Sequence, residues 1–344
     1  MKRAVILGGT GVLGRAIAQR LLDAGWQVDI TGREASKMPA VLRDAGAKFI
    51  SSDRRNAEDL ALALRNGADL VVDAACYTAA DAGLLLPHLH AVGSAVMLSS
   101  KAVYIDDAGN HVNSGIPPKF PLPIREDQPT MAPGKGDYRS REGYGANKVA
   151  AEHVLLDSGH PVTVIRPSKV HGAGATVPRE WMFLKRILDR RPTIFLADAG
   201  AGADHTTAAV NTAALVETVA DRPGQRILNS ADPDAPTGLD IARTLADYLG
   251  HQWEEILLDA ADHHPDLGTH PWNFTPPLIL DTQASTALGY QPVGTYAQTV
   301  TAEIDWLVAN PANQPGPTDP SFDHFTDYAL EDAYLATHQR RRST

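Results

Sequence analysis

Apolar and polar positions alternate along most of the chain in a pattern that predicts strands and helices in turn. Short apolar runs bounded by glycine or polar residues indicate buried strands, and longer amphipathic runs indicate the helices between them. The predicted strands cover residues 4–7, 28–31, 48–50, 70–73, 95–98, 162–165 and 227–229. Strands that alternate with helices are typical of a doubly wound α/β fold with a parallel sheet. The pattern therefore predicts that fold class.

The remaining amphipathic runs predict a smaller second part of the molecule. Helices are expected at residues 181–188, 207–220, 238–249, 296–308 and 325–338. Thr237 is a suitable N-cap for the helix over 238–249. The basic residues of the helix over 181–188 are expected on a solvated face, and the last helix is expected to dock through Tyr328, Leu330 and Tyr334.

A glycine-rich segment directly follows the first predicted strand. Its glycines are spaced G-x-x-G-x-x-G at Gly8, Gly11 and Gly14, and an amphipathic run begins at Arg15. Such glycines allow a tight strand-to-helix turn and close approach of the backbone to a pyrophosphate at the helix N-terminus. The segment predicts a dinucleotide-binding Rossmann sheet. The residues expected to contact the cofactor here are Gly8, Thr10, Gly11, Val12, Leu13 and Gly14.

The end of the second strand bears on the choice of cofactor. An acidic residue at this position usually binds the ribose 2′-hydroxyl of NAD. Here the chain has Thr31, Gly32 and Arg33, and Asp29 comes two residues too early. A guanidinium is a bidentate partner for the 2′-phosphate of NADP, so we favour NADP(H) over NAD(H). The alternative is that Arg33 is a solvated loop residue.

Tyr144 and Lys148 lie four residues apart in a predicted helix. This spacing places both side chains on one face of the helix, one turn apart. A cation beside a phenol favours the phenolate form, and the pair is suited to exchanging a proton with a carbonyl or an alcohol. The pattern is common by itself and gains weight only from its neighbours.

Ala74 and Ala75, small residues that follow the strand over 70–73, are expected to allow close approach of the cofactor.

Composition narrows the classes of partner. The chain has 344 residues and a formal charge of −10, which argues against nucleic acid or an anionic membrane as a partner. No apolar run approaches transmembrane length, and the chain begins in its first strand without a secretory segment. Cys76 is the only cysteine, which fits a cytoplasmic protein. We expect a small-molecule substrate, and a homodimer is one of the assemblies that the sequence allows.

With these motifs in place, the chain resembles the extended branch of the short-chain dehydrogenase/reductases, which includes nucleotide-sugar epimerases and dehydratases. The motifs are GGTGVLG, SSKAVY, YGANKVAAE and RPSKVHG, and the resemblance covers roughly residues 1–310. It implies that Ser100 polarises a substrate carbonyl and that Tyr144 is the acid and base. It also implies that Lys148 holds the nicotinamide ribose. The further cofactor contacts that it implies are Asp53 and Arg54 near the adenine, and Pro167 and Ser168 at the nicotinamide.

The same resemblance implies a division of the chain. Residues 1–168 and 205–230 would form the NAD(P)-binding domain, and residues 169–204 and 231–310 the substrate-binding lobe. Residues 311–344 would form a linker and a C-terminal helix.

Two departures from the family pattern and one feature of the charge distribution bear on the substrate. Lys101 and Ala102 stand where dehydratases often carry Asp-Glu, and Asp204 stands where sugar-nucleotide enzymes carry an Arg that binds the pyrophosphate. The segment from 192 to 339 has few cationic residues. We therefore expect an NADP-dependent ketone reductase or alcohol dehydrogenase that acts on a neutral or amine-bearing molecule, such as a secondary-metabolite intermediate. The expected substrate contacts are Lys101, His171 and Trp181.

Two alternatives stay open at this point. A nucleotide-sugar epimerase would use the same fold and residues, and a regulatory or RNA-binding protein would keep the cofactor fold without the chemistry. The presence of Ser100, Tyr144 and Lys148 weighs against the second. No metal site is expected, because His263, His264 and His270 lack a completing ligand set and read as a solvated loop.

Overall fold

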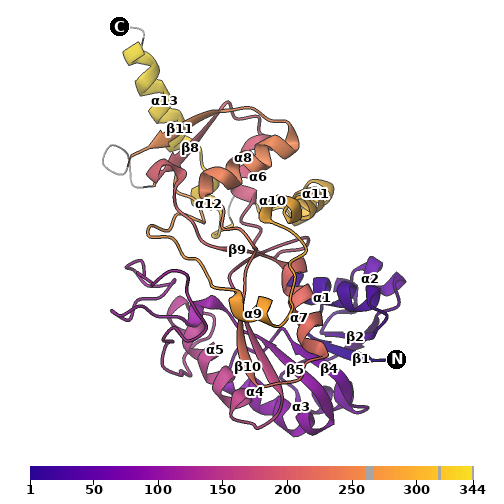
Figure 1. Cartoon of the computed structure of the whole chain (residues 1–344). Coiled ribbons are helices and arrows are strands. Elements are labelled where there is room, and N and C mark those ends of the chain that lie inside the picture. Colours follow the sequence, from indigo (N-terminus) through magenta and orange to yellow (C-terminus); the bar gives the residue numbers. More distant parts are fainter. Residues whose placement is uncertain (260–265, 317–318, 343–344) are drawn as a thin grey trace.

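The protein, described by a computed structural model over residues 1–259, 266–316 and 319–342, is built on a seven-stranded parallel sheet (Figure 1). The strand order is β10-β6-β5-β4-β1-β2-β3, so the chain winds outward in both directions from β1 and β4. The strands are β1 (Arg3–Leu7), β2 (Gln27–Gly32), β3 (Lys48–Ser51), β4 (Ala68–Asp73), β5 (Val92–Leu98), β6 (Val162–Pro167) and β10 (Arg226–Ser230). All seven predicted strands exist, and the predicted doubly wound fold class is confirmed.

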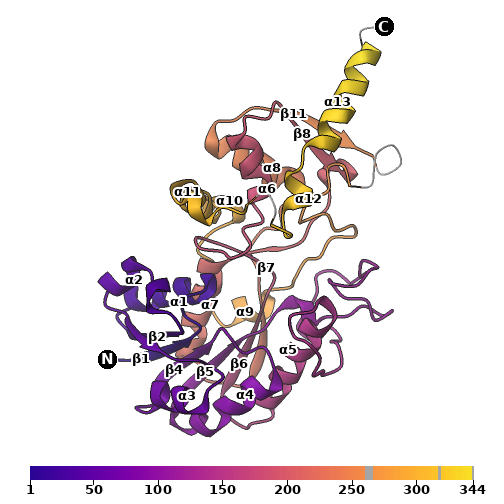
Figure 2. The ribbon, with the colours of Figure 1, turned by 180° about the vertical axis from the view of Figure 1, so that it is seen from behind.

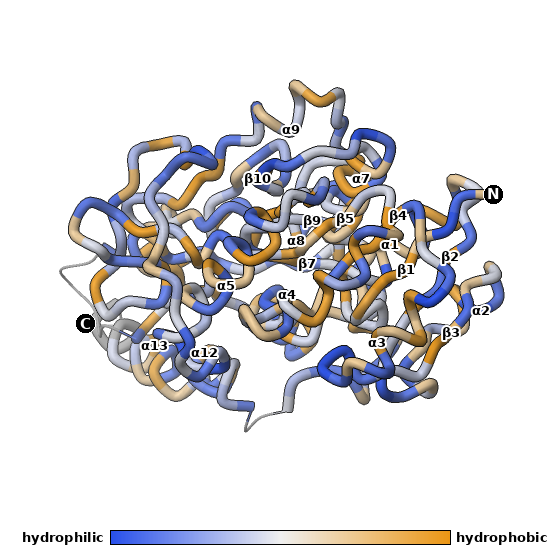
Figure 3. Tube along the Cα trace, turned by 90° about the horizontal axis from the view of Figure 1, so that it is seen from below, coloured by the Kyte–Doolittle hydropathy of each residue, from blue (hydrophilic) through white to orange (hydrophobic). Residues whose placement is uncertain are grey.

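Helices cover both faces of this sheet. Alternate residues of β1 point to opposite faces, as the two-residue period of a strand requires. Ala4 and Ile6 join the apolar cluster under α1 and α7, whereas Val5 and Leu7 join the cluster under α3, α4 and α5. Figure 3 shows the resulting concentration of hydrophobic residues at the central strands. The helices are α1 (Val12–Asp23), α2 (Ala40–Asp44), α3 (Ala57–Leu64), α4 (Ala79–Leu85), α5 (Arg141–Leu156) and α7 (Ala209–Ala220).

A second group of elements lies beyond the carboxyl ends of the strands (Figures 1 and 2). Its apolar core includes Phe183, which stacks on Trp272 with ring centroids 5.8 Å apart. Two short parallel pairs, β7 with β9 and β8 with β11, accompany the helices. The strands are β7 (Lys169–His171), β8 (Thr193–Ala197), β9 (Thr206–Ala208) and β11 (Glu254–Leu258). The helices are α6 (Trp181–Leu188), α8 (Gly238–Leu249), α10 (Tyr296–Thr299), α11 (Thr301–Ala309), α12 (Asp323–Thr326) and α13 (Ala329–Arg342). Helix α9 (Gln283–Ala287) packs instead against β10 of the main sheet, where Ser285 donates its hydroxyl to Asn229 O over 2.9 Å. The domain boundaries expected from the sequence stay a prediction.

Several helix predictions hold in this part, and others need correction. Thr237 caps α8 with a capping box, as expected. Arg186 of α6 is not solvated: it is 3% exposed, and its Nε donates to Glu331 of α13 over 3.1 Å. The helix expected from residue 207 begins only at Ala209, because residues 206–208 form β9. The expected helix over 296–308 is divided into α10 and α11.

Two side chains, His270 and Leu330, lie in surroundings that differ from those expected. The reason is the packing between distant segments. His270 is buried against Gly238 and Phe183 rather than solvated, and burial lowers its pKa to about 3. His263 and His264 lie outside the described residues. On α13, Tyr334 packs edge-on against Phe195 as a docking residue, but Leu330 is 40% exposed.

Candidate active site

A groove of about 520 Å³ runs along the carboxyl ends of β1, β2 and β4. The structure brings together here the cofactor contacts predicted from four separate segments of the sequence. They are Gly8, Thr10, Gly11, Val12, Leu13, Gly14, Arg33, Asp53, Arg54, Ala74 and Ala75. We call this the glycine groove.

The glycines allow α1 to begin at the floor of the glycine groove. Gly8 has φ 74°, a conformation that other residues rarely adopt. A Cβ on Gly14 would lie 2.6 Å from Gly9 Cα, so only glycine lets α1 pack this close to the turn. No side chain caps the N-terminus of α1, and no acidic residue occupies its first turn. The free N–H groups and the helix dipole therefore suit the pyrophosphate of a dinucleotide.

The charged residues of the glycine groove differ in whether they are exposed or already form ion pairs. Arg33 is exposed on its wall. Arg54 is buried, and its Nε donates over 3.0 Å to Asp73, so it supports the wall from behind. Asp29 is paired with Arg3 at 2.6 Å and does not line the groove. The groove thus presents a guanidinium, and no strand-end carboxylate, where the ribose 2′ position is expected.

A second cavity of about 550 Å³, which we call the central cavity, adjoins the glycine groove. The two share Leu13, Ala74 and Tyr77 in their walls. Of the residues predicted for chemistry and for the nicotinamide, six line the central cavity. They are Ser100, Lys101, Tyr144, Lys148, Pro167 and Ser168.

Local structure holds the three expected catalytic residues at this wall. Ser140 caps α5 by accepting a hydrogen bond from Gly143 N over 2.9 Å, and the helix then carries Tyr144 and Lys148 one turn apart. Lys148 Nζ donates to Cys76 O over 2.7 Å and lies 5.9 Å from the centroid of the Tyr144 ring. Ser100 Oγ accepts from Ala102 N over 3.1 Å, where the chain leaves β5 in a short 3₁₀ turn.

The far wall of the central cavity is rich in cations. Lys101, Lys169 and Arg179 line it, and Asp204 is the carboxylate between the two lysines. Lys169 Nζ lies 2.8 Å from Asp204 Oδ2. Burial and the positive charge of Arg179 lower the pKa of both lysines well below its usual value. The wall thus presents three basic side chains, with one carboxylate between the two lysines.

The sequence profile of the NAD dependent epimerase/dehydratase family matches residues 4–203, which include both the glycine groove and most of the central cavity. The chain belongs to the NAD dependent epimerase/dehydratase family. The resemblance inferred from the motifs is thereby confirmed. A comparison with curated proteins finds no significant match.

Solved structures of this family share the fold over most of the chain. UDP-glucose 4-epimerase of Thermus thermophilus, in complex with NAD, is 17% identical and has a TM-score of 0.64; the match covers 89% of this chain and 99% of that one. WbmG of Bordetella bronchiseptica, in complex with NAD and UDP, is 20% identical with a TM-score of 0.67, over 90% and 95%. A dTDP-glucose 4,6-dehydratase of Bacillus anthracis, also with NAD, is 14% identical with a TM-score of 0.67, over 91% and 98%. Identities this low show the fold alone.

Two of the predicted substrate contacts lie outside the central cavity of this family member. His171 is 2% exposed and held by Asp232, with Nε2 3.0 Å from Oδ2, and it lines a separate apolar pocket of about 270 Å³. Trp181 is 5% exposed within the apolar core of the second part of the molecule. Tertiary partners turn both side chains away from the central cavity, and their roles as substrate contacts stay predictions.

Other residues at both sites escaped the sequence analysis. At the central cavity these include Tyr77, Asn113, Arg141, Lys169 and Phe274. The glycine groove adds Arg55, Tyr138, Arg139 and Thr176. Most of these residues lie in loops without a local motif, whereas Arg141 begins α5 and Lys169 begins β7. The one available signal was the Lys within RPSKVHG, which directly follows the predicted nicotinamide contact Ser168.

No described helix combines the length and apolar character that crossing a bilayer requires.

Proposed function

We propose that the protein is an NADP(H)-dependent oxidoreductase that reduces a ketone, or oxidises the matching alcohol, on a substrate with an anionic group. The observation that carries this proposal is the junction of the glycine groove with the central cavity at Leu13, Ala74 and Tyr77. A cofactor whose pyrophosphate lies at the start of α1 would bring its nicotinamide to the wall that holds Ser100 and Tyr144.

Each of the three expected catalytic residues has a distinct part in this chemistry. A bound nicotinamide cofactor would supply or accept the hydride. Ser100 would donate a hydrogen bond to the substrate oxygen, and Tyr144 would give the proton to that oxygen or take it away. Lys148 would keep a positive charge beside Tyr144, because two backbone carbonyls at 2.7 and 2.9 Å fix its ammonium.

The proposed preference for NADP(H) rests on the charges of the glycine groove. Arg33 is exposed there, whereas Asp29, the nearest acidic residue on β2, is engaged by Arg3. Arg55 and Arg139 add positive charge to the same groove. The solved relatives named above were determined with NAD, so NAD(H) is the rival cofactor.

The anionic substrate replaces the neutral or amine-bearing molecule expected from the sequence. That expectation rested on the scarcity of cations between residues 192 and 339. The cations of the central cavity come instead from Lys101, Lys169 and Arg179, which precede that segment. A carboxylate or phosphate held by Lys169 and Arg179 would place the carbonyl of a small substrate near Ser100.

A nucleotide-sugar epimerase is the second candidate. Several solved relatives are UDP-sugar 4-epimerases, and Arg179 at the cavity wall provides a cation that a diphosphate needs. The two candidates differ in the fate of the cofactor. A reductase consumes NADPH in proportion to product, whereas an epimerase returns its cofactor to the starting state in each turnover.

A panel of substrates separates the candidates. The protein is incubated with NADPH and with ketones of one carbon skeleton that carry a carboxylate, no charge or an amine, and separately with NAD and UDP-sugars. We expect NADPH oxidation with the carboxylate ketone. Epimerised UDP-sugar without net cofactor change would support the second candidate, and no turnover of any compound would favour a non-catalytic protein.

A charge variant tests the substrate site directly. Lys169→Met removes a charge-assisted contact of about 1.5–3 kcal/mol and should raise KM for the carboxylate ketone roughly 10- to 100-fold, with a smaller effect on the neutral analogue. Lys185→Met, on the same part of the molecule but paired with Asp189 outside the cavity, is the control. An equal effect of Lys169→Met on both ketones would refute the anionic site.

A further inference from the structure

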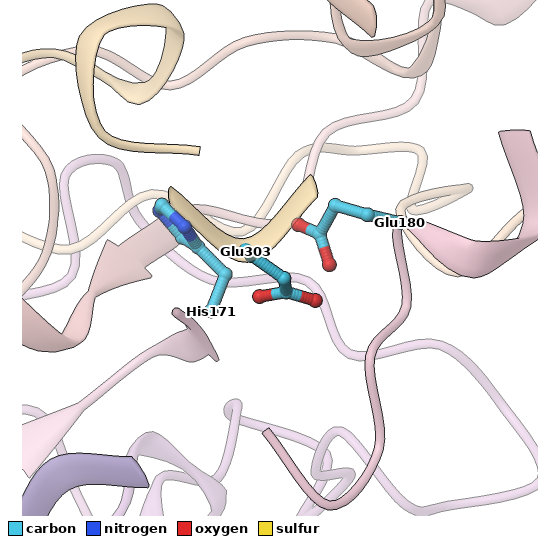
Figure 4. A group of neighbouring side chains, drawn as sticks. All are labelled: His171, Glu180 and Glu303. Carbon is cyan, nitrogen blue, oxygen red and sulfur yellow. The ribbon is translucent and has the colours of Figure 1, made fainter. Parts of the chain in front are cut away.

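Close to Arg179, one histidine and two glutamates meet in the interior. His171 ends β7, Glu180 directly precedes α6, and Glu303 lies in α11. One ring nitrogen and one oxygen of each carboxylate all lie within 4.8 Å of one another (Figure 4). The three residues are 2%, 2% and 0% exposed. We call them the His-Glu-Glu cluster.

The two carboxylates of the cluster are incompletely satisfied. Tyr296 donates its hydroxyl to Glu180 Oε1 over 3.2 Å, and Gly172 N donates to Glu303 Oε2. Glu303 Oε1 is buried and has no hydrogen-bond partner within the described residues. Burial and the neighbouring charge of Glu180 raise the pKa of Glu303 well above its usual value. A buried acceptor of this kind is costly unless a proton or a cation occupies it.

His171 is oriented as metal-binding histidines usually are. Its Nε2 lies 3.0 Å from Asp232 Oδ2, and Asp232 is itself fixed by Ala208 N and Asn211 Nδ2 at 2.6 and 2.8 Å. Because a carboxylate can only accept, Nε2 carries a proton, and Nδ1 is the ring nitrogen left to bind a ligand. In the part of the chain that the structure describes, Nδ1 has no partner. A carboxylate that orients a histidine in this way is typical of metal sites.

Three carboxylates meet here, and one cation lies beside them. Glu180, Glu303 and Asp232 are the acids, and Arg179 interacts with both glutamates. Fully ionised, this group carries a net charge of −2, which either protons or one divalent cation would neutralise. The unpartnered Nδ1 of His171 favours the cation, because a metal ion would use that nitrogen as a ligand. Buried charge that is left uncompensated is strongly unfavourable.

We propose that His171, Glu180 and Glu303 bind one divalent transition-metal ion, Zn²⁺ or Mn²⁺. One nitrogen and two carboxylate oxygens are ligands that such ions accept at about 2.0–2.2 Å, so small side-chain adjustments would close the cluster on one ion. The ion would join β7, the start of α6 and α11. Since Arg179 is adjacent to Glu180, it would also hold that guanidinium at the wall of the central cavity.

Metal binding by the full-length chain tests this proposal without reference to activity. The protein is freed of metal with a chelator, and Zn²⁺, Mn²⁺ and Mg²⁺ are titrated separately by calorimetry and followed by thermal unfolding. We expect one equivalent of Zn²⁺ or Mn²⁺ with micromolar or tighter affinity and a raised Tm, and weaker binding of Mg²⁺. Glu303→Gln and His171→Asn should lose this binding, and Asp232→Asn should weaken it roughly 10- to 100-fold.

A control separates the cluster from histidines elsewhere. The adjacent His263 and His264 offer the clearest alternative source of Zn²⁺ binding, so the double variant His263→Asn/His264→Asn should retain one tight equivalent. Binding that this double variant loses, or that survives in both Glu303→Gln and His171→Asn, would overturn the proposal. No stoichiometric binding to the wild type, together with a Tm that Glu303→Gln leaves equal or raises, would show instead that the glutamates share a proton.

Discussion

Helix α5 passes through two regions of the molecule, and the polar side chains of these regions differ greatly in how many hydrogen bonds they make. Toward its N-terminus, Tyr144 faces the central cavity, and its hydroxyl makes no hydrogen bond within the described residues. Two turns further on, Glu152 is 1% exposed and fully engaged. Ser99 donates its hydroxyl to Glu152, and Arg166 donates its Nε over 3.1 Å and its Nη2 over 2.5 Å.

Tyr144 and Glu152 belong to one sequence motif, and this difference in hydrogen bonding indicates that they have different roles. A buried acid with three donors stabilises the joint between α5 and the strands β5 and β6, and removing it would leave Arg166 uncompensated. A hydroxyl that faces a cavity contributes little to that joint and is free to meet a substrate. The same contrast holds between Arg54, engaged by Asp73, and Arg33, which is exposed on the glycine groove. At these four positions, engagement distinguishes the groups that hold elements together from the groups that face a cavity.

The largest effect is expected where a free group is removed from the cavity. Tyr144→Phe deletes a hydroxyl and little volume, so we expect turnover to fall by about 10²–10⁴-fold while cofactor affinity and Tm stay nearly unchanged. Hydride transfer is followed by cofactor absorbance with the substrate found in the ketone panel. Near-normal turnover in this variant would place the proton donor elsewhere, with Lys101 as the next candidate.

For Glu152, the hydrogen-bonded acid on the same helix, we expect a large loss of stability. Glu152→Ala leaves the Arg166 guanidinium buried without its carboxylate and should lower the free energy of unfolding by about 3–5 kcal/mol. Chemical denaturation measures this loss. Glu217→Ala, which removes an exposed partner of Arg20, should cost no more than about 1 kcal/mol. If both variants lose the same stability, engagement does not distinguish the two regions.

A smaller effect is expected at the glycine groove. Arg33→Asp should weaken NADPH binding by about 1.5–3 kcal/mol and change NADH binding much less, because only the 2′-phosphate is affected. Fluorescence titration of both cofactors measures the change, and Arg43→Asp, at an exposed position away from the groove, serves as a control. A wild-type preference for NADH would contradict the assignment of Arg33.

The smallest effect is a pH dependence at the His-Glu-Glu cluster. The folded-state pKa of Glu303 is raised, so its contribution to stability is present at acidic pH and is lost as the pH rises through that value. We expect the Tm of the metal-free protein to decline with pH more steeply than that of Glu303→Gln once the pH exceeds 4.5, the ordinary pKa of a glutamate. Added metal should reduce the slope in the wild type only. Parallel curves for the two proteins would contradict the raised pKa.

The glycine groove was predictable from the sequence because its chemistry is local. The turn at Gly8, the close packing at Gly14 and the first turn of α1 all lie within one short segment. The spacing of the residues in that segment therefore sets the geometry. The pair of Tyr144 and Lys148 is predictable for the same reason, since one helical turn sets their separation. The position of Arg33 was predictable because this residue directly follows the end of strand β2.

The central cavity was only partly predictable because its walls come from distant segments. Lys101 and Asp204 are more than a hundred residues apart, and nothing in either segment indicates their contact. Glu331 engages Arg186 across 145 residues and turns a predicted surface cation into a buried one. His171 illustrates the same limit: Asp232, 61 residues away, decides where its ring points.

The sequence alone determined the order of strands and helices, the doubly wound fold, the glycine turn and the spacing of Tyr144 and Lys148. These features depend on backbone preferences and on spacing within single elements. Ser100, which follows β5, was added to that pair only by the resemblance of the motifs to the family. Only the tertiary structure decided which charges are engaged and which face a cavity: Arg54 against Arg33, Glu152 against Glu303, and the cations around Asp204. The physical reason is that burial and pairing depend on which distant segments meet, and neither property belongs to a residue by itself.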